Sequence, residues 1–83
     1  MTIEAEIRQR LETAFAPSRL EVVNDSHKHA GHGGDDGSGE SHFSLLIRAE
    51  ALAPMTRLAR HRAVHQALGD LTARIHALAI DAA

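Results

Sequence analysis

A 17-residue segment in the first half of this 83-residue chain limits what the chain can fold into. Residues 25–41 hold five of the six glycines, three histidines and several aspartates and serines. Glycine loses more backbone entropy on folding than any other residue, and this segment has almost no apolar side chain to bury. We therefore expect residues 25–41 to form a flexible loop, with the packed structure built from the two flanking stretches.

The stretch before this loop predicts one helix and one strand. Apolar residues recur there every three to four positions, Thr2 suits an N-cap, and Pro17 cannot follow a helical residue, so we expect a helix from Thr2 to Phe15. The short β-branched run from Leu20 to Asn24 then predicts a strand.

The stretch after the loop predicts strand, helix and strand. His42–Arg48 alternates apolar and polar residues, and Thr56 suits the N-cap of a helix reaching about Leu71. Ile75–Ile80 is too short for an independent helix and reads as a closing strand. A short extra helical turn is expected near Pro54. The apolar stripe expected on the second helix consists of Leu58, His61, Val64, Leu68 and Leu71.

This order, α-β-β-α-β, predicts an α+β fold with a three-stranded sheet. Placing both helices on one face of the sheet is the economical way to bury these apolar stripes. The first two strands are expected to pair antiparallel across the long loop. The chain length allows one domain, so residues 1–83 are interpreted as a single unit.

The composition excludes several classes of protein. There is no cysteine for a disulfide framework, and no apolar run approaches the ~20 residues of a membrane span. Acidic residues stand where a signal peptide needs basic ones, so we expect a cytoplasmic protein with no membrane association. Neither a nucleophile elbow nor a phosphate-binding glycine motif is present, so we expect a binding protein and not an enzyme.

The seven histidines are the strongest candidates for chemistry. His27, His29 and His32 cluster in the loop, and imidazole is a general ligand for zinc, copper and iron. Two other interpretations are that these histidines are simply exposed in a solvated loop, or that the loop binds zinc by itself. His76 shares a strand face with Leu78. It is interpreted either as a partly buried structural histidine or as a metal ligand.

The second helix carries a basic surface. Arg57, Arg60, Arg62 and His65 suit contacts to phosphates or to a partner's acidic groups. The alternative is an ordinary solvated helix face. A net charge of −2 and only two aromatic residues weigh against nucleic acid, because stacking platforms for bases are scarce. His61 and His42 are interpreted as structural.

Four segments resemble the BolA family, in the same order and at matching spacing over nearly the whole chain. They are the strand and loop at 20–32, the strand start at 40–43, the Arg-His-Arg helix signature at 60–65 and the closing strand at 75–78. The resemblance implies a fold similar to class II KH domains, which agrees with the element order above.

The resemblance also implies a function. BolA-like proteins pair with monothiol glutaredoxins and share a bridging 2Fe-2S cluster, in iron-sulfur trafficking or iron homeostasis. Glutaredoxin and glutathione then supply thiolates, and this chain supplies nitrogen ligands, as histidine does on one iron of Rieske centres. By position, His76 matches the closing-strand ligand and His29 the loop ligand, with His27 and His32 near enough to substitute. Alone, the chain is expected to hold no cluster, and an apo homodimer is a further alternative.

Some family members are described as nucleic-acid-binding transcriptional regulators, which is the alternative function. The family usually has Gly-Lys before the Arg-His-Arg helix, where this chain has Pro54 and Met55. A flexible turn and a cation are therefore missing, which counts against DNA binding.

Overall fold

The computed structural model describes residues 2–25, 42–75 and 77–83. The expected loop, apart from Asp25, therefore lies outside the described residues. The order α-β-β-α-β is confirmed. The elements are α1 (Ile3–Phe15), β1 (Arg19–Asn24), β2 (His42–Arg48), α2 (Arg57–Leu68), the 3-10 helix η2 (Gly69–Arg74) and β3 (Ala77–Ala82).

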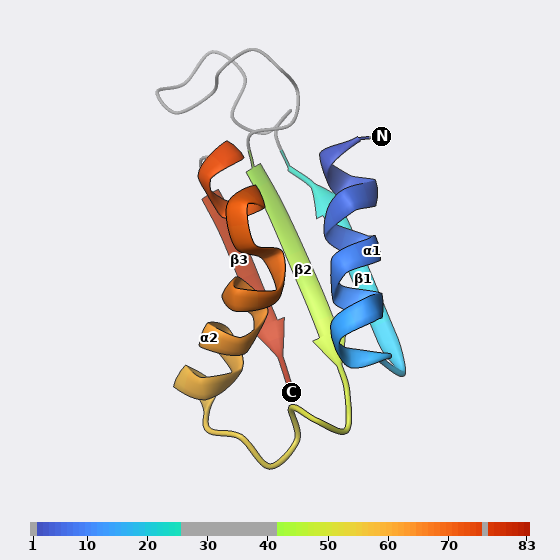
Figure 1. Ribbon diagram of the computed structural model, residues 1–83, viewed down its shortest axis with the longest axis vertical. Coiled ribbons are helices and arrows are strands. Elements are labelled where there is room, and N and C mark those ends of the chain that lie inside the picture. Colours follow the sequence, from blue (N-terminus) through green and yellow to red (C-terminus); the bar gives the residue numbers. More distant parts are fainter. Residues whose placement is uncertain (1, 26–41, 76) are drawn as a thin grey trace.

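The strands form one mixed sheet in the order β1-β2-β3 (Figure 1). β1 pairs antiparallel with β2, as expected, and Val22 lies opposite Leu45. β3 pairs parallel with β2, and Ile80 lies opposite Leu45 on its other side. A parallel neighbour requires a crossover connection, and α2 with η2 supplies it.

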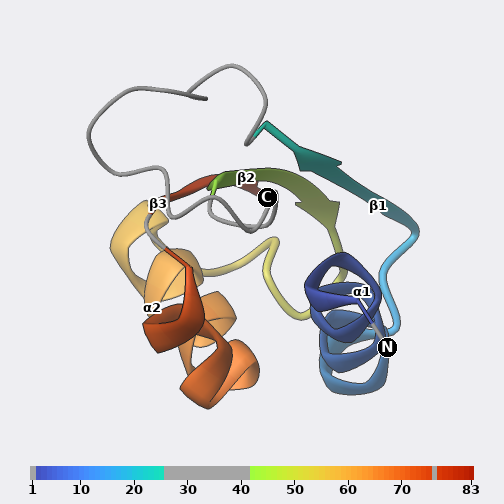
Figure 2. The ribbon, with the colours of Figure 1, turned by 90° about the horizontal axis from the view of Figure 1, so that it is seen from above.

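Both helices lie on one face of the sheet, as the sequence predicts (Figure 2). Alternation in β2 directs Phe43, Leu45 and Ile47 toward the helices, and all three are buried. The core that they form is completed by Ile3, Ile7, Leu11, Val22, Ala49, Leu52, Val64, Leu68 and Leu71.

The ends of α1 follow from local chemistry. The Thr2 side chain accepts a hydrogen bond from the Ala5 backbone N–H at 3.1 Å, which confirms it as the N-cap. Ala16 adopts the left-handed conformation with φ 46° and donates its N–H to the Glu12 carbonyl at 3.0 Å. The helix therefore ends at Phe15, two residues before Pro17.

The second helix begins as predicted, because the Thr56 side chain accepts a hydrogen bond from the Ala59 N–H at 3.1 Å, but it ends earlier than predicted. α2 ends at Leu68, not about Leu71, because Gly69 takes a positive φ of 55° and the chain continues as η2. Leu58, expected on the buried stripe, is 59% exposed and lines an open hollow with Arg57 and His61.

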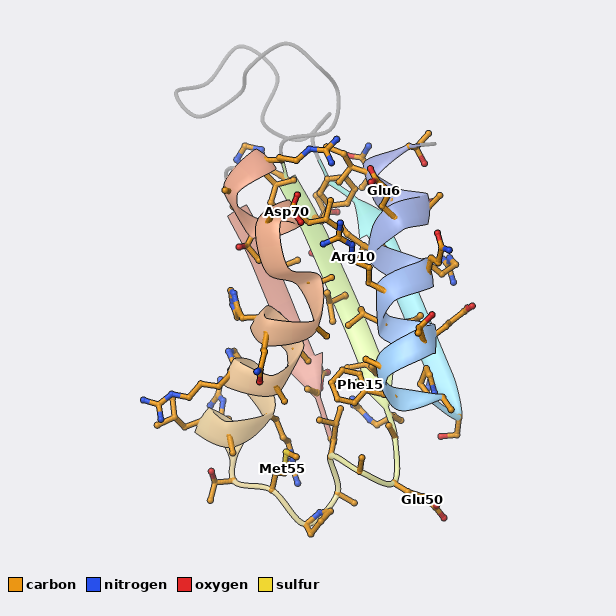
Figure 3. The ribbon with its side chains drawn as sticks, viewed as in Figure 1. Glu6, Arg10, Phe15, Glu50, Met55 and Asp70 are labelled. Carbon is orange, nitrogen blue, oxygen red and sulfur yellow. The ribbon has the colours of Figure 1, made fainter. Side chains whose placement is uncertain are left out.

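A polar link joins α1 to the end of α2 (Figure 3). The Arg10 guanidinium donates to the Leu68 carbonyl at 2.6 Å and to the Asp70 carboxylate at 2.7 Å. This hydrogen bond and the positive charge of Arg10 lower the pKa of Asp70 from its ordinary 3.8. The two helices are thus held together by polar contacts as well as by the core.

Turns before α2 and the position of β3 complete the fold. The chain turns over residues 50–54, where Leu52 and Ala53 donate to the Ala49 carbonyl at 3.0 and 3.2 Å. The extra turn near Pro54 is therefore present without extending into a helix. β3 is shifted by two residues from the predicted 75–80. None of the described helices is long and apolar enough to cross a membrane.

Candidate functional site

The predicted cluster ligands fall outside the part of the chain that the structure describes. His27, His29 and His32 belong to residues 26–41, and His76 likewise lies outside the described residues. Their ligand roles remain predictions. Among the described residues, no group of three His, Cys, Asp or Glu side chains is arranged to hold a metal ion.

The described residues next to these histidines meet at one end of the sheet. Asp25, the last described residue before the histidine-rich segment, donates its N–H to the His42 carbonyl at 2.8 Å. His42 in turn lies opposite Ala77, the first residue of β3, in the parallel register. Asp25, His42 and Ala77 therefore form one row across the sheet, and residue 76 directly precedes this row in sequence.

His42 itself behaves as a structural residue, as the sequence analysis expects. It is buried, with 9% of its surface exposed, and it is not without a partner. On the same strand, the Ser44 hydroxyl donates to the Asp25 carboxylate. These polar contacts tie the start of β2 to the end of β1 where the histidine-rich segment joins them.

The basic residues predicted on α2 divide by what they contact. Arg60 is committed to the fold, because its guanidinium donates to the Leu52 and Ala53 carbonyls, each at 2.8 Å. Arg57, Arg62 and His65 are exposed, and none of them has an ion-pair or hydrogen-bonding side-chain partner among the described residues. Only these three remain available as contact residues.

A groove between α2 and the end of β3 is the feature that sequence reasoning missed. Arg57, Arg60 and His61 line one wall, and Ile80 with its neighbours lines the other, around a volume of about 480 Å³. A second hollow of about 350 Å³, lined by Arg57, Leu58 and His61, adjoins it. No signal in the sequence indicated it, because Leu58 was expected on the buried stripe and the proximity of α2 to β3 is a tertiary feature.

Comparison with known proteins identifies relatives over most of the chain. The family model described as BolA-like protein matches residues 11–83. An uncharacterized protein in the cobS 5′ region of Sinorhizobium sp is 48% identical over 100% of this chain and 91% of its own length. The DNA-binding transcriptional regulator BolA of Vibrio cholerae is 40% identical over 94% of this chain and 71% of its own.

Solved structures agree with these sequence matches. BolA1 from Arabidopsis thaliana superposes with a TM-score of 0.83 at 30% identity, over 95% of this chain and 87% of that chain. Some relatives are much longer than the present chain. This chain matches 56% of the length of mouse BolA-like protein 1. The two are 42% identical over 96% of this chain.

Proposed function

Since the chain belongs to the BolA-like protein family, we propose that it is a binding module that pairs with a monothiol glutaredoxin and co-ligates a bridging 2Fe-2S cluster. In this proposal His76 and His29 are the ligands from this chain. The role of the complex is iron-sulfur trafficking or iron homeostasis.

The donor set of the chain suits a shared cluster. The chain has seven histidines and no cysteine, so it offers imidazole nitrogen but no thiolate. A 2Fe-2S cluster accepts two histidines on one iron while thiolates hold the other. A partner must therefore supply the thiolates, which is the part given to glutaredoxin and glutathione. The same requirement explains why the chain alone is not expected to hold the cluster.

The row of Asp25, His42 and Ala77 is the observation that carries the proposal. The segment with His29 continues from Asp25, and His76 directly precedes Ala77 in sequence. The described residues from which these two segments continue, Asp25 and Ala77, therefore lie in one row at the same end of the sheet. Two ligands to one iron must meet within a few ångströms, so this row supports the proposal.

Reconstitution with glutaredoxin tests the proposal. The protein is mixed with monothiol glutaredoxin carrying its glutathione-bound cluster, and visible absorption and circular dichroism are recorded. We expect a new spectrum at a one-to-one ratio, which His76→Ala abolishes and His29→Ala weakens. Gln66→Ala, at an exposed position on α2 to which no contact is assigned, is the control and should leave the spectrum intact. A spectrum that does not change on mixing, or that ignores His76→Ala, would exclude the proposal.

Acid provides a second test of histidine ligation. Only neutral imidazole binds a metal, so protons compete with the iron for each histidine. We expect the spectrum of the mixed complex to be lost at a higher pH than that of the cluster-loaded glutaredoxin alone. Equal acid sensitivity of the two would argue against histidine ligands.

A DNA-binding regulator is the second candidate function. The relative from Vibrio cholerae bears that name, and the exposed Arg57 and Arg62 on α2 are available to phosphates. Binding through these arginines predicts an affinity for DNA that falls steeply with salt, with a shallower dependence in Arg57→Ala and Arg62→Ala. Electrophoretic mobility shifts at several salt concentrations measure this. A shift that is insensitive to salt, or no shift, would exclude phosphate recognition by α2.

A further inference from the structure

The outer edge of β3 carries backbone groups that the sheet does not use. Ala83 directs both its N–H and its C=O to β2, bonding to Ile47 at 3.1 Å and to Ala49 at 3.2 Å. Backbone groups alternate along a strand, so those of Leu78, Ile80 and Ala82 point to the open side. They have no backbone partner there within the described chain, because β3 is an edge strand of the sheet. Such an edge is a template for one more strand.

The groove beside this edge has a wall made by α2. Arg57, Arg60 and His61 face Ile80, Asp81 and Ala82 across about 480 Å³. The side chains at positions 78, 80 and 82 are half-buried and pack against the core on the helix side of the sheet, and those at 80 and 82 also line the groove. A strand added to β3 would therefore have one of its faces turned toward α2.

The charges of the groove favour an acidic ligand. Arg57 is exposed, and no carboxylate among the described residues pairs with it. The one acid on the wall, Asp81, is already paired with Arg48 at 3.1 Å. Beside Arg57, the 59% exposed side chain of Leu58 adds an apolar contact in the adjoining hollow.

We propose that this groove binds an extended acidic peptide segment of a partner protein, which pairs with the open edge of β3 as a fourth strand. Backbone hydrogen bonds to Leu78, Ile80 and Ala82 supply the sequence-independent part of the affinity. A glutamate or aspartate of the peptide pairs with Arg57, and an apolar residue contacts Leu58. The three edge residues match a peptide of about five residues at roughly 3.3 Å per residue.

The same surface is less suited to nucleic acid. Single-stranded bases stack on aromatic side chains, and the two aromatic residues of the chain are the buried Phe43 and the half-buried Phe15. Peptide binding here does not require a bound cluster, because none of the residues that line the groove is a predicted cluster ligand. Its test can therefore succeed or fail independently of the glutaredoxin test.

Fluorescence anisotropy with a short labelled peptide tests the proposal. The probe is an acetylated hexapeptide of alternating glutamate and valine, and its control has lysine in place of glutamate. We expect binding of the acidic probe only. Arg57→Glu should weaken it about three- to tenfold, since a partly exposed attraction becomes a repulsion. Arg62→Glu, the same charge change on the same helix but outside the groove, should leave the affinity within about twofold.

Amide signals identify the binding edge. We expect the acidic probe to shift the NMR signals of the Leu78, Ile80 and Ala82 amides and to slow their hydrogen exchange, with the β1 edge unaffected. Equal binding of the lysine peptide, or shifts elsewhere, would overturn the proposal. So would tighter binding of a labelled oligothymidine that both charge reversals weaken alike, because that result would assign the surface to nucleic acid.

Discussion

At the scale of single residues, Asp70 shows how an exposed carboxylate is tied to the fold. Its hydrogen bond from Arg10 and the charge of that guanidinium lower the pKa of Asp70 below its ordinary 3.8. A carboxyl whose pKa is lower in the folded state stabilises the protein above the unfolded pKa, and this contribution is lost as the pH falls through the folded value.

We therefore expect Asp70→Asn to lower the melting temperature slightly at pH 7. The difference from the unmodified protein should shrink once the pH falls below about 4 and vanish at lower pH. Thermal melts followed by circular dichroism between pH 2 and pH 7 measure it. Glu12→Gln, which removes an exposed carboxylate with no ion pair among the described residues, is the control. A difference that stays constant down to pH 2 would contradict this assignment.

Two residues with positive φ predict mutational effects of opposite sign. Ala16 has φ 46° and Gly69 has φ 55°, a region that is strained for residues with a Cβ. We expect Ala16→Gly to raise the free energy of unfolding, and Gly69→Ala to lower it, each by about 1 kcal/mol. Urea denaturation measures both. The Cβ at position 69 would meet only Arg10 at 3.5 Å, so the loss there reports backbone strain.

At the scale of elements, α2 holds the turn that precedes it through Arg60. Its guanidinium bridges the Leu52 and Ala53 carbonyls, and Leu52 is fully buried. The Arg60 side chain therefore holds in place the segment that connects β2 to α2. Arg60 was predicted to be a contact residue, because helical spacing does not reveal what a guanidinium reaches outside its own helix.

We expect Arg60→Met to cost about 1–3 kcal/mol of unfolding free energy, since the part-buried Leu52 carbonyl and the exposed Ala53 carbonyl both lose a charged donor. Arg62→Met is the same substitution at an exposed position two residues further along α2. It should lower the free energy of unfolding by less than about 0.5 kcal/mol. Chemical denaturation of the two variants compares them directly. Equal losses would show that the contacts to residues 52 and 53 add nothing to stability.

At the scale of the whole molecule, one buried layer between the sheet and the helices holds the domain. Ile47, in the central strand, is 0% exposed, whereas Val23 on the opposite face of the sheet is 49% exposed. A domain of this length has a total stability of only about 4–12 kcal/mol. Loss of a single core side chain therefore removes a large part of it.

We expect Ile47→Ala to lower the unfolding free energy by about 2–5 kcal/mol, by lost burial and a residual cavity. Val23→Ala should cost less than about 1 kcal/mol, because its side chain is half solvated already. Urea denaturation monitored by far-ultraviolet circular dichroism separates the two. A loss at Val23 as large as that at Ile47 would indicate that the outer sheet face is covered in solution.

The sequence by itself determined the element order and the buried faces. The spacing of Ile3, Ile7 and Leu11 and the alternation of β2 are local periodicities, and each element must turn its apolar side to a common core. The resemblance to the BolA family was likewise readable from short segments, and the family is confirmed. The ligand roles of His29 and His76 stay predictions, because both residues lie outside the described part of the chain.

Only the tertiary structure decided how distant residues meet. The parallel pairing of β3, the row from Asp25 to Ala77, and the groove between α2 and β3 all join positions far apart in sequence. No local period encodes such contacts, since they depend on which surfaces remain once the core is packed. For the same reason Leu58, apolar and correctly spaced, became an exposed side chain beside the groove.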